Sequence, residues 1–502
     1  MRLVTKDTAS IAELRAALES RRITARALTA AFLDRIAAID GGEDGLRSVI
    51  EVNPDALAIA EACDAALAAG APRGPLHGVP LLIKDNIDTA DAMHTTAGAL
   101  ALLGSRPTED ATVVARLRAA GAVIIGKTNL SEWANFHSDK QLSGWSGRGG
   151  QTRNPHDRAR SPSGSSSGSA AAVAAGMAAA ALGTETNGSI VDPAGACGIV
   201  GLKPTVGLVS RAGVIPLAGS QDTVGPMTRG VADAALLLGV LAGVDGRDAA
   251  TVASDGRMVA DYTQFLDADG LRGARIGVAR EVYCGYHRET DAVIEAAIAL
   301  MRQRGAVIVD PANIPTARAI ADTDTSRTVL LYEFHAQVDA YLAGRAAWGE
   351  HVELRGVRSL ADVVAYNRAH AAETMPFAGQ EILEAALATG PLTDTVYTEA
   401  LATNRRLARE QGIDAAMDEY RLDALIAPTS HPAWLIDHVL GDLYLGGSST
   451  PAALAGYPLI SLNAGFVHGL PVGLTLMGRA WSEPTLIRLA YAFELARGVG
   501  AG

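Results

Sequence analysis

The sequence predicts a single large α/β domain, in which a central mixed β-sheet is covered by helices on both faces. Helix-like and strand-like segments alternate along most of the 502 residues, a pattern typical of α/β proteins. No tandem repeat and no long polar linker divides the chain, although its length alone would allow about two to four domains. We therefore expect one domain over residues 1–502, with the helical region 311–419 as an addition around the core.

Local signals justify the elements in chain order. Ser10 and Glu13 form a capping box, which predicts a helix from Ile11 onward. Asn53-Pro54 opens a second apolar-periodic helix. The other predicted elements are strands at residues 78–88, 122–129, 274–280, 306–311, 423–428, 458–466 and 471–478, and helices at residues 111–121, 231–243, 290–305 and 482–498.

Composition excludes several functional classes. The net charge of −12 argues against a nucleic-acid or anionic-membrane surface as the main partner. The three cysteines are too few and too scattered for a disulfide framework or a zinc site. The longest apolar run, residues 170–182, is too short to span a bilayer, and the N-terminal segment has no apolar stretch of signal-peptide length. We expect a monomer without cofactor or metal, cytoplasmic as the sequence stands or exported if a signal peptide has been removed.

One segment matches the phosphate-loop pattern letter for letter. Residues 121–128 read GAVIIGKT, and such a motif works when its central residues form a loop between a strand and a helix. Here the residues between the glycines are the strand-compatible run Ala-Val-Ile-Ile, and the preceding element is a helix. We therefore interpret the segment as a strand and not as a nucleotide site.

A second segment matches the nucleophile-elbow pattern G-x-S-x-G. It covers residues 164–168 with Ser166 at its centre, and the motif requires a strand immediately upstream. The upstream residues RNPHDRARSPS are instead rich in proline and turn formers. His431, His438 and His468 follow later in the chain, and none of them stands in a motif that indicates a catalytic histidine. A Ser–His hydrolase that uses Ser166 stays open as an alternative.

Residues 164–193 carry a third pattern, in which a serine cluster, a run of small apolar residues and a glycine-flanked serine follow one another. A serine hydroxyl needs a nearby base to become a nucleophile, and a neutral lysine can be that base. Lys84 ends the apolar run Val79–Ile83, where burial would lower its pKa. A flexible linker would leave Lys84 and the serine spacing unexplained.

These segments resemble the amidase signature family. The resemblance rests on GVPLLIKDNID, GSSSGSA and TNGSI, on the flanking blocks GKTNLSEWANF, GLKPTVGLVSR and SQDTVGPMTR, and on the late DALIAPTSHPAW. Family-like blocks cover about residues 70–230 and residue 420 to the end. Within the family, SGWSGRGGQTRNP and SPSGSSSGSA look closest to bacterial peptide amidases, which release ammonia from the C-terminal carboxamide of peptides. The resemblance therefore implies an enzyme that acts on linear amide C–N bonds of small peptide amides.

The resemblance also implies a Ser–Ser–Lys triad. Ser189 would be the nucleophile that forms the acyl-enzyme, Ser165, 24 positions earlier, the middle serine after a cis peptide bond, and Lys84 the base. We expect the segment 170–182 to be a helical spacer that brings the two serine turns side by side. The oxyanion hole would be formed by backbone N–H groups of one turn, those of Thr186, Asn187, Gly188 and Ser189.

Three positions near Ser189 depart from the family pattern. Asn187 stands where the family usually has glycine and the peptide-amidase-like members aspartate, and Val191 replaces an arginine of the broader family, a change the subgroup shares. Asp192 stands where the subgroup has a cysteine. A carboxylate buried beside Lys84 would raise the lysine pKa, whereas one in the first turn of a short helix would be harmless. Because Pro193 follows, we expect Asp192 to be solvated and away from Lys84.

A second function class uses the same family fold and triad. The A-type subunit of an amidotransferase generates ammonia from glutamine for a partner bound to transfer RNA. The sequence shows no basic patch or tail that would serve such a partner. The stand-alone amide hydrolase is therefore the expected function, with the amidotransferase subunit as the alternative.

Overall fold

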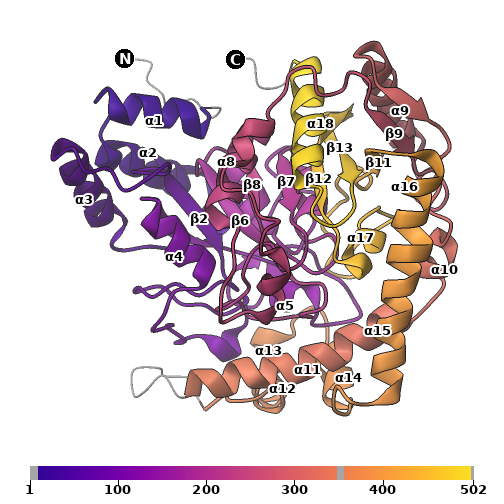
Figure 1. Ribbon diagram of the computed structural model, residues 1–502. Helices are drawn as coiled ribbons and strands as arrows, with labels where there is room; N and C mark the ends of the chain where they lie inside the picture. Colours follow the sequence, from indigo (N-terminus) through magenta and orange to yellow (C-terminus); the bar gives the residue numbers. More distant parts are fainter. Residues whose placement is uncertain (1–8, 347–355, 499–502) are drawn as a thin grey trace.

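A computed structural model describes residues 9–346 and 356–498 (Figure 1). Its core is an 11-stranded mixed sheet flanked by helices, so the predicted fold class is confirmed. In spatial order the strands are β1 (Val49–Val52), β3 (Val123–Thr128), β2 (Pro80–Lys84), β6 (Ala180–Glu185), β8 (Thr223–Thr228), β7 (Val200–Lys203), β12 (Leu459–Val467), β13 (Leu470–Met477), β11 (Ala424–Pro428), β9 (Arg275–Val278) and β10 (Val307–Val309). A separate two-stranded ribbon consists of β4 (Trp145–Ser146) and β5 (Gly150–Gln151).

The sheet is parallel in two regions and antiparallel elsewhere. Strand β2 runs parallel to both of its neighbours, β3 and β6. At the other edge β9 runs parallel to β10 and β11. The strands between these regions pair antiparallel, from β6–β8 through β12–β13 to β13–β11. Because β2 and β6 are parallel neighbours, their carboxyl ends meet at one edge of the sheet, where Lys84 and Glu185 lie.

Helices cover the sheet on both faces (Figure 1). Helices α8 and α18 contact each other and pack on the strands β7, β8 and β12, while α6 and α7 contact each other near the serine turns. The larger helices are α1 (Ile11–Glu19), α2 (Ala25–Ile39), α3 (Ala56–Ala68), α4 (Thr112–Ala119), α6 (Ser167–Ala174), α7 (Val191–Cys197), α8 (Val231–Leu241), α9 (Arg288–Gln303), α11 (Thr325–Ala346), α12 (Leu360–Ala369), α14 (Glu381–Leu387), α15 (Thr395–Ala408), α16 (Asp414–Tyr420) and α18 (Glu483–Ala496). Shorter ones are α5 (Glu132–Asn135), α10 (Ala317–Ala321), α13 (Ala371–Thr374), α17 (Thr450–Ala455), a π-helical turn (Arg409–Ile413) and three 3-10 turns (Leu100–Leu102, Ala249–Ser254 and Tyr262–Phe265).

In the described residues of region 311–419 the regular elements are helices, joined by loops. Its helices α11 to α14 gather along the lower side in Figure 1, and the long α15 rises beside them. Residues 347–355 of this region lie outside the described residues. That the region is an addition around a core stays a prediction, but its α11 contributes residues to the cavity described below.

The alanine run 170–182 is only partly helical, so this prediction was wrong in its second half. Helix α6 ends at Ala174, and after a turn the chain enters β6 at Ala180. Every residue of β6 is buried, and the strand lies between β2 and β8 in the sheet. Intrinsic helix propensity is a weak prior that tertiary context overrides, and small side chains suit a strand covered on both faces. A Cβ on Gly183 would approach Met227 and Ser166 too closely, which illustrates how tight this strand is.

Most other predicted elements have counterparts in the structure. The Ser10–Glu13 capping box is present with both of its hydrogen bonds, and the phosphate-loop look-alike is the buried strand β3 with the lysine inside it. Sequence reasoning missed the ribbon strands β4 and β5 and, besides β6, three strands of the main sheet: β1, β7 and β8. Two of them, β7 and β8, contain glycine or proline, which weaken a strand signal in the sequence.

Candidate active site

Lys84 lies at the end of β2, fully buried. Its Nζ lies 2.8 Å from Ser165 Oγ and 2.9 Å from Ser166 Oγ. Two further acceptors come from Thr184 at the end of β6, the side-chain Oγ1 at 2.8 Å and the carbonyl oxygen at 3.2 Å. The parallel pairing of β2 and β6 therefore places the amine in a cage of hydroxyl groups.

Burial lowers the pKa of Lys84 to about 7, and desolvation of the ammonium form is the largest cause. The carboxyl groups of Glu185 and Asp222 oppose this effect and keep the pKa from falling further. The expected lowering by burial is thus confirmed. A substantial fraction of Lys84 is neutral at pH 7, as a base that takes a proton from serine must be.

The two serine turns lie side by side, as expected. The N–H of Ser166 donates to the carbonyl oxygen of Ser189 at 3.1 Å, which ties one turn to the other. The Gly164–Ser165 peptide bond is cis, also as the resemblance implied. Gly164 has no room for a side chain, because a Cβ there would overlap with the Ser131 hydroxyl.

Ser189 opens onto a cavity of about 440 Å³. Its hydroxyl finds no hydrogen-bond partner among residues 9–346 and 356–498, whereas Ser165 pairs with Lys84. The cavity wall combines the serine turns, the segment Ala134–Phe136, the start of α11 and the segment 434–450. The structure thus brings the three predicted catalytic residues together, with Ser189 facing the space where a substrate would lie.

The turn before Ser189 is held by Glu185. Its carboxyl group accepts hydrogen bonds from the N–H groups of Gly188 (2.9 Å), Ile190 (2.7 Å) and Val191 (3.0 Å). Gly188 has a φ of +80°, a conformation that favours glycine, and a Cβ there would overlap with Asp192. Gly188 was predicted as an oxyanion donor, but its N–H already serves Glu185.

The other predicted oxyanion donors are available. In the described part of the chain no acceptor pairs with the N–H groups of Thr186, Asn187 or Ser189. The Asn187 side chain points elsewhere, because its Oδ1 accepts from Ser449 Oγ at 2.7 Å. The Thr186 hydroxyl donates to Asp222 at 2.5 Å, which fixes the start of the turn.

Ser166 is not exposed as an elbow nucleophile would be. It is fully buried at the start of α6, and its hydroxyl donates to the carbonyl oxygen of Thr184 at 3.1 Å while it accepts from Lys84. No strand precedes it, and no histidine is among its hydrogen-bond partners. The geometry gives Ser166 the role of holding Lys84, which the motif comparison did not suggest.

Asp192 is not solvated, so this expectation was wrong. It lies in the first turn of α7 but is only 8% exposed, because Tyr444 covers it. The expected separation from Lys84 fits the structure: the acids that act on the Lys84 pKa are Glu185 and Asp222. The sequence could not place Tyr444, which comes from a segment 252 residues away.

Sequence reasoning also missed Thr184, Glu185 and Asp222. The first two stand at the end of β6, which the alanine-rich composition disguised as helix. Asp222 comes from the loop before β8, a strand that was not predicted. The sequence did contain a signal for Glu185. An acid four residues before the candidate nucleophile Ser189 can accept hydrogen bonds from the N–H groups of the turn that follows it.

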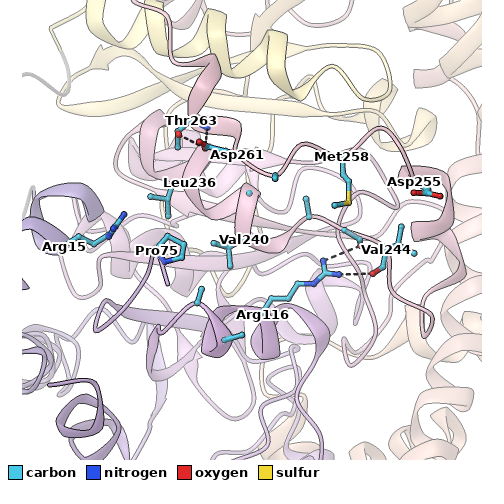
Figure 2. A pocket seen from close by; sticks show the side chains of 16 residues that line it. Arg15, Pro75, Arg116, Leu236, Val240, Val244, Asp255, Met258, Asp261 and Thr263 are labelled. Atoms are coloured by element: carbon cyan, nitrogen blue, oxygen red, sulfur yellow. Dashed lines mark hydrogen bonds between the residues drawn. The ribbon is translucent and has the colours of Figure 1, made fainter. Parts of the chain in front are cut away.

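A larger cavity lies elsewhere, away from the serine turns. It measures about 930 Å³ and lies between α4, α8 and the segment 255–263 (Figure 2). Its lining contains no serine, cysteine, histidine or lysine. Arg116 reaches into it and donates to the backbone carbonyl oxygen of Val244 (Figure 2). Arg116 also donates to the carbonyl oxygen of Leu241. Of these two cavities, only the one at Ser189 lies beside the serine turns and the buried Lys84.

Comparison with known proteins shows the family of the chain. The family model described as Amidase matches residues 27–487, which is most of the chain. The chain belongs to the amidase family. It is therefore an amide C–N hydrolase, and the fold matches that of solved amidase structures.

Individual relatives refine this picture. The crystal structure of a native peptide amidase from Stenotrophomonas maltophilia is 51% identical, has a TM-score of 0.92, and the match covers 97% of this chain and 96% of that one. A probable amidase from Arabidopsis thaliana is 41% identical over 495 residues, covering 97% of this chain and 90% of the relative. The A subunit of the glutamyl-tRNA(Gln) amidotransferase from Moorella thermoacetica is 37% identical over 496 residues, with 96% and 95% covered.

Two further features bear on amidase function. Within the described residues no helix is both long and apolar enough to cross a membrane. In that same part of the chain, side chains of His, Cys, Asp and Glu do not gather into a group that would hold a metal ion.

Proposed function

We propose that this amidase hydrolyses the C-terminal carboxamide of peptides and releases ammonia through an acyl-enzyme on Ser189. The observation that carries the proposal is Lys84, buried with a pKa of about 7 and hydrogen-bonded to Ser165 beside the Ser189 turn. The similarity to a peptide amidase at 51% identity supports the choice of substrate.

The proton path follows from the hydrogen bonds of the two neighbouring serines. Ser166 donates its proton to a carbonyl oxygen and so can only accept from Lys84. Ser165 has no other side-chain hydrogen-bond partner in the described chain, so its hydroxyl can donate to neutral Lys84 and accept from Ser189. Hydrogen bonds of this kind often form only in the substrate complex, which fits the unpaired Ser189 hydroxyl. Ser165 then relays the proton of Ser189 to Lys84.

The tetrahedral intermediate needs donors for its oxygen. The N–H groups of Thr186, Asn187 and Ser189 are unpaired and belong to the turn that carries the nucleophile. Loss of one donor from such a hole costs about 3 kcal/mol in a comparable serine enzyme. Gly188 contributes by its conformation, since only glycine fits between Asp192 and Ser449.

An assay of the purified chain alone tests the proposal. We expect ammonia release from a peptide amide such as an N-acetyl amino-acid amide, and little release from glutamine. The alternative, an amidotransferase A subunit, is favoured by the 37% identity to such subunits. Release of ammonia from glutamine but not from the peptide amide would reject the peptide-amidase function in its favour.

The pH dependence of the reaction tests the role of Lys84. Because the folded-state pKa of Lys84 is lowered to about 7, the neutral form prevails above that pH. We expect kcat/KM for a peptide amide to rise with pH, with a midpoint near 7, and then to level off.

Two variants provide the contrast. Asp222→Asn removes a charge that raises the Lys84 pKa, so the midpoint should move to lower pH. Asp192→Cys should leave the midpoint in place, because Asp192 does not act on that pKa. A midpoint that moves in Asp192→Cys and stays in Asp222→Asn would contradict this electrostatic picture.

A further inference from the structure

One part of the wall of the catalytic cavity is apolar. It is formed by four side chains that we call the apolar wall: Phe136, Leu217, Leu330 and Ile382. These residues come from four separate segments of the chain but belong to one hydrophobic cluster. Leu330 is partly buried in that cluster, and the other three keep 4% to 7% of their surface accessible. The cluster thus presents an apolar surface to the cavity that Ser189 also lines.

The apolar wall begins beside the Ser189 turn. The N–H of Leu217 donates to one oxygen of the Asp222 carboxyl group at 2.8 Å, and the Thr186 hydroxyl donates to the other oxygen at 2.5 Å. Thr186 belongs to the turn that carries Ser189, so a single carboxyl group links Leu217 to that turn. The apolar wall therefore lies close to the place where the acyl-enzyme would form.

The other lining residues suit the main chain of a peptide amide. Most of them carry hydroxyl, amide or carboxyl groups, such as Asn187 and Thr450. Arg327, on the same helix as Leu330, forms an ion pair with Asp139 at 2.8 Å, so its guanidinium group is already engaged. A side chain without hydrogen-bonding groups fits best against the apolar wall, because burial of apolar surface there is favourable and leaves no polar group unpaired.

We propose that the apolar wall binds the side chain of the amidated residue, so that the enzyme prefers carboxamides of large apolar residues such as leucine and phenylalanine. A glycine amide leaves the apolar wall uncovered, and an aspartate side chain would lose its hydration against that wall. Burial of a leucine side chain there raises kcat/KM by about tenfold to hundredfold over glycine. This inference rests on the proposed peptide-amide function and names the side chains that the site accepts.

The first test measures kcat/KM of the full-length enzyme for four N-acetyl amino-acid α-amides, those of leucine, glycine, aspartate and lysine. The leucine amide should exceed the glycine amide by about tenfold to hundredfold. The aspartate and lysine amides should both react more slowly than the leucine amide, because their charged groups lose hydration at the apolar wall.

A pair of neighbouring leucines on α11 separates substrate binding from stability. Leu330 and Leu331 are both partly buried against the same hydrophobic cluster, but only Leu330 lines the cavity. Leu330→Ala should reduce the preference for leucine over glycine by about three- to tenfold and leave the glycine amide almost unchanged. Leu331→Ala removes the same group and should keep the preference. If Leu330→Ala does not fold, Leu330→Asn keeps the volume of the side chain and also removes its apolar surface.

Three outcomes would overturn the inference. Equal kcat/KM for the leucine and glycine amides in the wild type would mean that the side chain does not touch the apolar wall. An equal change of preference in Leu330→Ala and Leu331→Ala would mean that the cluster acts through the fold alone. Preference for the lysine amide would assign the side chain to the exposed carboxyl group of Asp324, which also lines the cavity.

The same assay tells failure of the inference from failure of the proposed function. A wild-type enzyme that hydrolyses all four amides without the expected order would reject the role of the apolar wall and leave the peptide-amidase function standing. A wild-type enzyme inert toward all four amides would reject the proposed function itself, and the inference with it.

Discussion

Replacing Ser189 with alanine is expected to abolish hydrolysis of peptide amides and of the matching esters alike. The acyl-enzyme needs a covalent bond to the Ser189 oxygen, and without that oxygen neither substrate can form it. Removal of the nucleophilic serine lowers kcat on the order of 10⁶-fold in a well-studied serine protease. We expect a loss of similar size here, measured as kcat for an N-acetyl amino-acid amide and its methyl ester.

Another serine in the same cavity provides the control. Ser326 lines the cavity from α11 and has no hydrogen bond to the Lys84 cage. Ser326→Ala should keep most of the activity, with folding of both variants checked by circular dichroism. Measurable ester hydrolysis in Ser189→Ala at a tenth of the wild-type rate or more would assign the nucleophile to another residue.

Replacing Lys84 with alanine is expected to impair amides much more than esters. In the proposed mechanism neutral Lys84 takes the proton of Ser189 through Ser165 and returns it to the departing nitrogen. An amide nitrogen leaves badly unless it is protonated as the C–N bond breaks, whereas an ester oxygen leaves with little help. Each acid or base step contributes typically about 10²–10⁴-fold, so the amide loses two contributions and the ester mainly one.

The comparison requires kcat/KM for a peptide amide and its methyl ester, measured above about pH 8, where Lys84 is neutral in the wild type. The preference for the amide should narrow in Lys84→Ala. Ser166→Ala provides the contrast, because it removes one hydrogen bond of Lys84 but keeps the amine. Equal losses of amide and ester would remove the acid role of Lys84, and wild-type-like amide turnover would reject the triad altogether.

The sequence predicted those residues of the candidate site that lie in short segments with a clear local pattern. Lys84 ends an apolar run that indicates a strand, and Ser165 and Ser189 stand in glycine-flanked turns. Burial of Lys84 follows from its strand, so the direction of its pKa shift was predictable as well. The sheet that brings the lysine and the serines together was expected only as a fold class.

Other parts of the site depend on contacts between distant segments. The second half of the alanine run is a strand because β2 and β8 enclose it, and a local helix propensity cannot report those neighbours. The neighbouring Pro193 and a helix start predicted a solvated Asp192. In the structure Tyr444, 252 residues away in the sequence, hydrogen-bonds to Asp192 and covers it. The hydrogen bond from the Gly188 N–H to the Glu185 carboxyl group could be recognised only once the end of β6 was placed.

The covalent adduct of a serine-directed phosphonate tests the central claim most directly, because it reports which hydroxyl is the nucleophile. The purified enzyme would be treated with the reagent. The mass of the adduct would be measured by mass spectrometry, and the labelled residue would be located by peptide mapping. The unpaired hydroxyl of Ser189 and its place in the cavity wall predict a single label on Ser189. A label on Ser166, which the structure buries against Lys84 and Thr184, would contradict the Ser–Ser–Lys assignment.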